Sequence, residues 1–276
     1  GDAITTGNRN VALGTSAMST NILGSKSTAL GTNALLTQNP ATAVDMHNTA
    51  VGYSAGTAVT TGVQNTIVGG LAGDAITTGG NNICVGYLAG THATNLITGS
   101  GNVIIGDFAD VSAEDTDYAN VIGYNVTGVA GYTTVGRDGD DIAAAHGNVT
   151  WATVSDERVK KDIEDATVGL AFINDLRPRT FNYKNKGDIP VAFKGYEEDS
   201  TEAYKNSEAQ HGFIAQEVKA AIDKHSDIKD GFSMWREEEI TGQQRVGEAA
   251  LIPMLTKAVQ ELSAKVEELE DKLNNK

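Results

Sequence analysis

The chain has 276 residues and a formal net charge of −15, from 36 acidic residues against 21 Lys and Arg. Such an acidic chain lacks the basic face that nucleic acids and anionic membranes require, so neither is expected as a partner. The single cysteine, Cys84, excludes an internal disulfide framework and a four-cysteine zinc site. No apolar run reaches the ~18 residues of a membrane span, so membrane insertion is not expected. The sequence predicts no cofactor and no metal site.

Residues 1–150 repeat one short unit, in which Asn or Ser is followed by two or three small or β-branched apolar residues and then Gly. The unit recurs at residues 10–14, 27–31, 48–52, 65–69, 82–86, 102–106 and 120–123. The closing glycines are 17, 21, 17, 17, 20 and 17 residues apart. The chain begins at Gly1 in the middle of a repeat, which we interpret as a fragment of a longer protein.

Strands this short become stable by stacking on the next rung, while Gly supplies the corners with positive φ. The pattern therefore predicts a mainly β region, either a β-solenoid or a β-prism of three intertwined chains. A core of Ala, Val and Ile is thin for one chain, which favours three chains around an axis. Regular spacing argues against a disordered linker. An acidic loop from Asp107 to Asp117 could hold a cation, although a solvated loop is the favoured interpretation.

This repeat style resembles the shafts of trimeric phage tail fibres and, more loosely, the heads of trimeric bacterial adhesins. The resemblance implies no site residue.

The repeats end near Trp151, and Ser155 and Lys160 follow within the stretch Ser-Asp-Glu-Arg-Val-Lys. Ser155 or Asp156 could simply cap a helix that starts near Glu157, and Lys160 could lie on a solvated helix face. A Ser and a Lys five residues apart are also common by chance. These two residues alone therefore do not identify a site.

The wider context resembles one family. Ser155–Ile163, Leu176–Tyr183 and His211–Val218 are followed by a C-terminal heptad helix. This order is similar to the self-cleaving intramolecular chaperone domain at the C-termini of phage tailspikes, tail fibres and endosialidases. The resemblance covers about residues 150–276 and implies an α+β domain that ends in a trimeric coiled coil.

The resemblance further implies cleavage of the Val154–Ser155 bond, with Ser155 as the nucleophile and Lys160 as the base of a Ser–Lys dyad. Lysine acts as a base only without its proton, a state that burial favours. On a helix, five residues turn ~140° away from one face. Ser155 must therefore precede the helix and bend back over it, or Lys160 must act on the serine of a neighbouring copy.

Four residues are candidates for a supporting role. Asp156 would orient the turn, while Gln216 and Glu217 would form hydrogen bonds near the site. His211 could assist catalysis, but a structural histidine is the favoured interpretation. Around them, 179–183 alternates as a strand does, and 211–222 begins extended and becomes an amphipathic helix.

The C-terminal segment has apolar residues spaced alternately three and four apart, which is typical of a coiled coil. The seam residues are Ile252, Leu255, Val259, Leu262, Val266, Leu269 and Leu273. A core helix of a globular fold is the alternative. The pattern leaves dimer and trimer open, but a fibre requires a trimer.

We therefore predict a fibre shaft at 1–150, a chaperone and autoprotease domain at 151–250, and a coiled coil at 251–276. The expected protein is a phage tail-fibre fragment, assembled in the host cytoplasm and carried on the virion. Its expected partners are two further copies of itself and a glycan or protein receptor on the host surface. The first alternative is a trimeric surface adhesin with a non-cleaving stalk. A glycan-cleaving enzyme is disfavoured, because the repeats show no convincing carboxylate pair.

Overall fold

The computed structural model describes residues 1–148, 150–153, 155–228 and 232–275. The chain divides into two units, Gly1–Lys161 and Asp162–Lys276. Within the described residues, we find no helix with the length and apolar character needed to cross a membrane.

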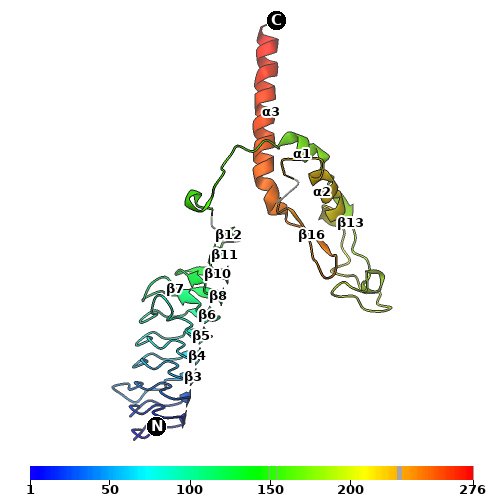
Figure 1. The fold of residues 1–276 in the computed structure, drawn as a ribbon. Coiled ribbons are helices and arrows are strands. Elements are labelled where there is room, and N and C mark those ends of the chain that lie inside the picture. Colours follow the sequence, from blue (N-terminus) through cyan, green and yellow to red (C-terminus); the bar gives the residue numbers. More distant parts are fainter. Residues whose placement is uncertain (149, 154, 229–231, 276) are drawn as a thin grey trace. The chain divides into compact units, whose positions relative to one another are not determined.

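The first unit is a β-solenoid of about seven turns (Figure 1). One sheet runs along it in the order β1-β2-β3-β4-β5-β6-β8-β10-β11-β12, parallel from β1 to β10 and antiparallel thereafter. Its strands are β1 (Val11–Leu13), β2 (Thr28–Leu30), β3 (Thr49–Val51), β4 (Thr66–Val68), β5 (Ile83–Val85), β6 (Val103–Ile105), β8 (Asn120–Tyr124), β10 (Tyr132–Arg137), β11 (Asp140–Ala145) and β12 (Ala152–Thr153). A small second sheet pairs β7 (Asp110–Val111) with β9 (Thr127–Gly128).

Each rung closes within one chain and bonds to the next rung of that chain. Of the two predicted arrangements, the structure therefore has the solenoid rather than the intertwined prism. In β2 to β6 the middle residue of each strand points inward, and Ala29, Ile67 and Ile104 have no exposed surface. These residues belong to one continuous apolar core along the solenoid.

The Asn that opens each of the four central repeats, at positions 48, 65, 82 and 102, lies fully buried and links successive rungs. Asn65 Oδ1 accepts a hydrogen bond from the backbone N–H of Asn82 at 3.0 Å, and its Nδ2 donates to the carbonyl of Gly79 at 2.9 Å. Asn48, Asn82 and Asn102 make the same kind of contacts. Buried amides of this kind satisfy backbone groups at the corner before each strand.

The Gly that closes each repeat is required by both its conformation and its surroundings. Gly69 has φ +136°, in the region that side chains rarely adopt, and a Cβ built on it would lie 2.3 Å from the carbonyl oxygen of Gly86. Gly31, Gly52 and Gly86 show the same combination. The repeat motif is thus explained by the stacking of one rung on another.

The acidic loop binds backbone amides of the preceding rung. Asp110 is buried, and its Oδ2 accepts hydrogen bonds from the N–H groups of Ala93 and Thr94 at 2.6 and 2.7 Å. Asp107 Oδ1 accepts from the Tyr87 N–H at 2.8 Å. Across the described residues, no group of three or more His, Cys, Asp or Glu side chains is placed to hold a metal ion.

The second unit is a small α+β domain with a long terminal helix. Its elements are α1 (Leu170–Asp175), β13 (Arg179–Phe181), the 3₁₀ helix η2 (Lys186–Asp188), β14 (Gln210–Gly212), α2 (Ala215–Ile222), β15 (Trp235–Glu237), β16 (Gln244–Val246), the 3₁₀ helix η3 (Glu248–Ala250) and α3 (Leu251–Asn274). β13 pairs with β14, and β15 pairs with β16. The strand predicted at 179–183 and the extended-then-helical segment at 211–222 are both confirmed.

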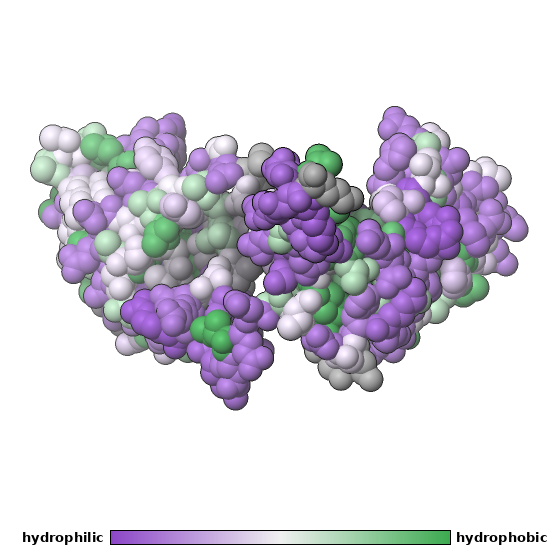
Figure 2. Space-filling view, turned by 90° about the horizontal axis from the view of Figure 1, so that it is seen from above, coloured by the Kyte–Doolittle hydropathy of each residue, from purple (hydrophilic) through white to green (hydrophobic). Residues whose placement is uncertain are grey.

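The core of this unit is built around Phe172, Val218 and Met234, with Phe232 and Trp235 packed against it. Large hydrophobic residues also remain on the surface of both units. In the space-filling view, green hydrophobic residues lie exposed among purple hydrophilic ones (Figure 2). All seven residues of the predicted seam of α3 belong to this exposed set.

Candidate functional site

The segment that carries Ser155 and Lys160 is organised by a single 3₁₀ turn, η1 (Glu157–Val159). Asp156, rather than Ser155, caps this turn, because its side chain accepts a hydrogen bond from the Arg158 N–H at 2.9 Å. Lys160 follows in extended conformation, with φ −112° and ψ 152°. The helix predicted from Glu157 is therefore only one turn long, and the helical geometry that would have separated Ser155 from Lys160 does not arise.

The turn brings the two predicted dyad residues together within one chain. Lys160 Nζ donates a hydrogen bond to Ser155 Oγ at 2.8 Å. This distance lies in the range expected of a nucleophile and its base. Of the two pairings that the sequence left open, this structure contains the one within a single chain. The catalytic roles of Ser155 and Lys160 remain predictions.

Ser155 and Lys160 are both exposed in the single chain. A lysine in water holds its proton at neutral pH, and apolar surroundings are what favour the uncharged amine. The single chain therefore has the distance that the predicted chemistry needs but lacks the burial. The predicted scissile bond joins Val154 to Ser155, and Val154 lies outside the described residues.

Asp156 acts on the turn, as predicted from the sequence, and its partner Arg158 was not foreseen. The Arg158 guanidinium donates to both carboxylate oxygens, at 2.9 and 2.6 Å. This pairing and the backbone N–H of Arg158 hold the pKa of Asp156 below its ordinary value. An acidic residue at the start of a turn and a basic residue two positions later, within the turn, are the signal that could have revealed this pair.

The other three candidate residues lie in the second unit. Glu217, on α2, accepts hydrogen bonds from the Arg179 guanidinium, including one from Nε at 2.8 Å, and these hold the pKa of Glu217 below its ordinary value. His211 Nδ1 lies 3.2 Å from Thr180 Oγ1, across the β13–β14 pair. Gln216 and His211 line a surface pocket of about 870 Å³. Their supporting roles stay predictions.

α3 confirms the predicted terminal helix and presents two different apolar faces. The face toward the body of its unit carries Leu251 and Ala258, both buried, and Glu261, whose Oε2 accepts from the N–H of Leu170 at 2.9 Å. The predicted seam lies on the other face. All seven seam residues are between 45% and 74% exposed: Ile252, Leu255, Val259, Leu262, Val266, Leu269 and Leu273.

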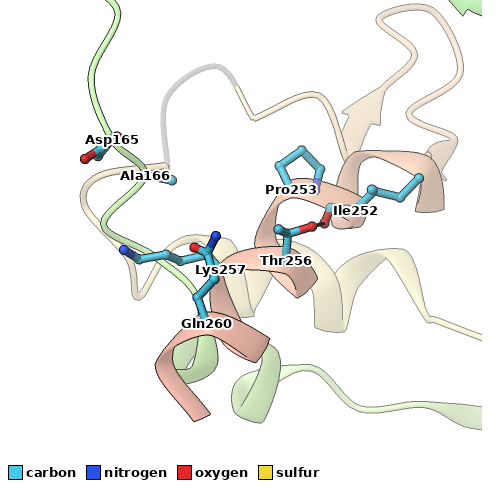
Figure 3. Close-up of a pocket in the computed structure, with 7 residues that line it drawn as sticks. All are labelled: Asp165, Ala166, Ile252, Pro253, Thr256, Lys257 and Gln260. Atoms are coloured by element: carbon cyan, nitrogen blue, oxygen red, sulfur yellow. Dashed lines mark hydrogen bonds between the residues drawn. The ribbon is translucent and has the colours of Figure 1, made fainter. Parts of the chain in front are cut away.

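A pocket of about 600 Å³ lies beside the start of α3 (Figure 3). The helix lines it with the first seam residue, Ile252, and with Pro253, Thr256, Lys257 and Gln260. Asp165 and Ala166 line it from the segment that connects η1 to α1. The first turns of α3 pack on the body of the unit through Leu251 and Ala258, and both the pocket and the seam remain accessible to solvent.

Comparison with known proteins finds a family model that matches the segment beginning at Ser155. A peptidase family model, described as chaperone of endosialidase, matches residues 155–227. Its name suggests a self-cleaving peptidase domain. No curated protein and no solved structure matches the chain significantly. The match to the chaperone of endosialidase, next to a β-solenoid, fits a tail fibre with an intramolecular chaperone domain and supports a chaperone role in fibre folding.

Proposed function

We propose that the chain is part of a trimeric phage tail fibre whose C-terminal domain aligns three copies, helps their solenoids to fold, and then cleaves the Val154–Ser155 bond. The observation that supports cleavage is the 2.8 Å contact between Lys160 Nζ and Ser155 Oγ. The exposed seam of α3 supports the alignment of copies. The fibre is assembled in the host cytoplasm, belongs to the virion, and meets a glycan or protein receptor on the host.

The cleavage is an acyl shift followed by hydrolysis. The neutral amine of Lys160 takes the proton of the Ser155 hydroxyl, and Oγ attacks the carbonyl carbon of Val154. The carbon–nitrogen bond breaks, and the nitrogen of Ser155 recovers a proton from Lys160. Water then hydrolyses the resulting ester, which gives a carboxylate on Val154 and a free amine and hydroxyl on Ser155. Because the attacked carbonyl directly precedes the nucleophile, no substrate pocket is needed.

Assembly supplies the burial that the single chain lacks. Around the dyad in the sequence, Trp151, Val159 and Ile163 are large apolar residues with 49%, 70% and 63% of their surface exposed. When copies associate and cover such residues, Lys160 moves into surroundings that favour its neutral form. Cleavage then follows assembly and does not occur in an unassembled chain.

Alignment by α3 lowers the entropic barrier to forming the fibre. Bringing distant segments of three chains together in register is slow, because the loop-closure entropy is lost before the contacts form. A helix that associates through local heptads makes this step intramolecular. After cleavage, residues 155–276 leave and the fibre can no longer be realigned, so its persistence becomes kinetic.

Intact mass spectrometry of the purified chain tests the cleavage. The unaltered chain should yield a fragment that begins at Ser155, whereas Ser155→Ala and Lys160→Ala should remain uncut. Lys161→Ala is the matched control, since it removes the neighbouring lysine but keeps the contact between Ser155 and Lys160, and it should still cleave. A fragment starting at residue 155 from the Ser155→Ala chain would refute the dyad. An unaltered chain that stays whole while trimeric would instead indicate an adhesin with a non-cleaving stalk.

A further inference from the structure

The sheet of the solenoid presents a continuous row of apolar side chains to its outside. In the three-residue strands β2 to β6 the middle residue points into the core, so the two residues beside it point outward. Strand register aligns the third residue of each strand from β1 to β6 with Ile122 of β8 and Val135 of β10. We call this row the outer ladder: Leu13, Leu30, Val51, Val68, Val85, Ile105, Ile122 and Val135.

All eight residues of the outer ladder are at least partly exposed. At ~4.8 Å between paired strands, the row is about 34 Å long. A second outward row, formed by the first residue of each strand from β1 to β6, contains only Val, Thr and Ile. The two rows together make an elongated apolar face, and such faces mark sites of association.

Charge indicates what covers this face. Strands β1 to β6 contain no charged residue, whereas residues 1–154 as a whole carry 11 acidic and 3 basic side chains. Copies of this array repel one another wherever their acidic residues meet. The sheet face is a surface on which two copies can meet without like charges.

The spacing of the ladder indicates the same occupant. Its side chains repeat at the strand spacing of this sheet, through unequal rungs of 17, 21, 17, 17, 20 and 17 residues. A second copy in register offers the same apolar row with the same spacing at every level. Apolar, uncharged patches of this kind are typical of interfaces between identical chains.

We propose that the outer ladder is a contact surface between copies of this chain, with three solenoids packing their sheet faces, in register, around a common axis. This proposal rests on the proposed function, because α3 supplies the parallel alignment. It adds the surface that holds the shaft together after residues 155–276 have left. The solenoid core remains within each chain, and the contact between chains is a separate, outer one.

Cysteine cross-linking of the full chain tests the proposal. Val68→Cys places a thiol on the outer ladder, and Thr78→Cys places one at an exposed position ten residues further around the rung. The native Cys84 is fully buried, and burial raises its pKa to about 12, so its thiol reacts slowly. Each variant is first confirmed to be trimeric by native mass and is then treated with a short bis-maleimide.

The expected result is a shift of the Val68→Cys chain from one-chain to two-chain mass on a denaturing gel. Thr78→Cys and the unaltered chain should stay at one-chain mass. Equal cross-linking of the two variants in a trimeric protein would overturn the ladder contact and leave the proposed function intact. A monomeric native mass for every chain would overturn both, since neither α3 nor the ladder would then join copies.

Discussion

In the solenoid, every rung is tied to the next by backbone hydrogen bonds and by buried side chains such as Asn65 and Ile67. In the second unit, a small core around Phe172 is surrounded by surface ion pairs such as Arg179–Glu217 and Lys186–Glu202. Surface ion pairs contribute little to stability, and stacked buried contacts contribute more. The first unit therefore has the construction of a durable part, and the second, with its smaller core, is compatible with the proposed release of residues 155–276.

The two units also differ in where their apolar surface remains. In the solenoid part of it lies on the strands of the sheet, and in the second unit most of it lies on the seam of α3. A helix seam associates through contacts close in sequence, whereas aligned sheets need correct register along their whole length. For the proposed trimer, the difference implies an order, in which α3 joins the copies before their solenoids make contact.

The largest expected effect comes from the seam of α3. Val266→Asp places a charge on the predicted helix contact, and Ala264→Asp places the same charge on an exposed position two residues earlier, off the seam. We expect Val266→Asp to abolish both the trimer and the fragment that begins at Ser155, because cleavage follows assembly. Native mass and intact mass measure the two losses. Cleavage that persists in a monomeric Val266→Asp chain would show that the dyad does not need assembly in order to act.

Gly69→Ala should destabilise the solenoid more than any other single change considered within it. Positive φ alone costs a side chain ~1–3 kcal/mol, and the new Cβ would also collide with the Gly86 carbonyl. We expect a loss of more than about 3 kcal/mol in the free energy of unfolding, from backbone strain and the collision together. Urea unfolding followed by circular dichroism measures it.

The adjacent Gly70 provides the matched control for that change. A Cβ built there would lie 3.5 Å from the ring of Tyr87, an ordinary contact. Gly70→Ala should therefore stay within about 0.5 kcal/mol of the unaltered chain. Similar losses for both variants would show that the close approach of rungs at Gly69 is not what selects glycine.

Asn65→Ala should have an intermediate effect on the solenoid. It leaves the buried N–H of Asn82 and the carbonyl of Gly79 without their side-chain partner. An unsatisfied buried group costs ~1–3 kcal/mol, so we expect a loss of about 2 kcal/mol or more. Thr78→Ala, at an exposed position away from the outer ladder, is the control and should change the same urea midpoint little. Equal midpoints for the two variants would contradict a structural role for the buried Asn residues that link successive rungs.

Repetition explains why the solenoid could be predicted from the sequence. Asn65 and Gly69 recur with their neighbours in each rung, so the local pattern already contains the contacts that the fold uses. α3 was equally predictable along its seam, because the heptads are local. The face of α3 that packs on the body of its unit could not be predicted, since Glu261 accepts a hydrogen bond from the N–H of Leu170, 91 residues away in the sequence. No local pattern contains a contact of that range.

The dyad segment shows the same limit at shorter range. Ser155 and Lys160 could be selected only through a resemblance, because two polar residues five apart have no pattern of their own. The single turn between them depends on Asp156 capping it and pairing with Arg158. Without knowledge of that cap, the same residues are equally compatible with a longer helix from Glu157. The proposed burial of the pair could not be foreseen from local sequence, because it would depend on other copies of the chain.

The smallest expected effect concerns Glu217 and decides whether it belongs to the folding of the second unit or to the cleavage. Its contacts with Arg179 lower the pKa of Glu217 in the folded chain. A carboxyl with a lowered pKa stabilises the fold above the ordinary carboxyl pKa, and this stabilisation is lost as the pH falls through the lowered value. Glu217→Gln should therefore destabilise the second unit slightly at pH 7, and the difference from the unaltered chain should vanish in acid.

Thermal unfolding of the uncut Ser155→Ala chain at several pH values measures that difference without interference from cleavage. Glu198→Gln, which changes an exposed carboxylate of the same unit, is the control and should show little dependence. In the cleavable chain, Glu217→Gln should then slow cleavage no more than its loss of folded protein explains. A cleavage rate that falls at pH 7 while the unfolding temperature stays unchanged would instead place Glu217 beside the reacting atoms, and the Arg179 pair would then be a means of positioning it.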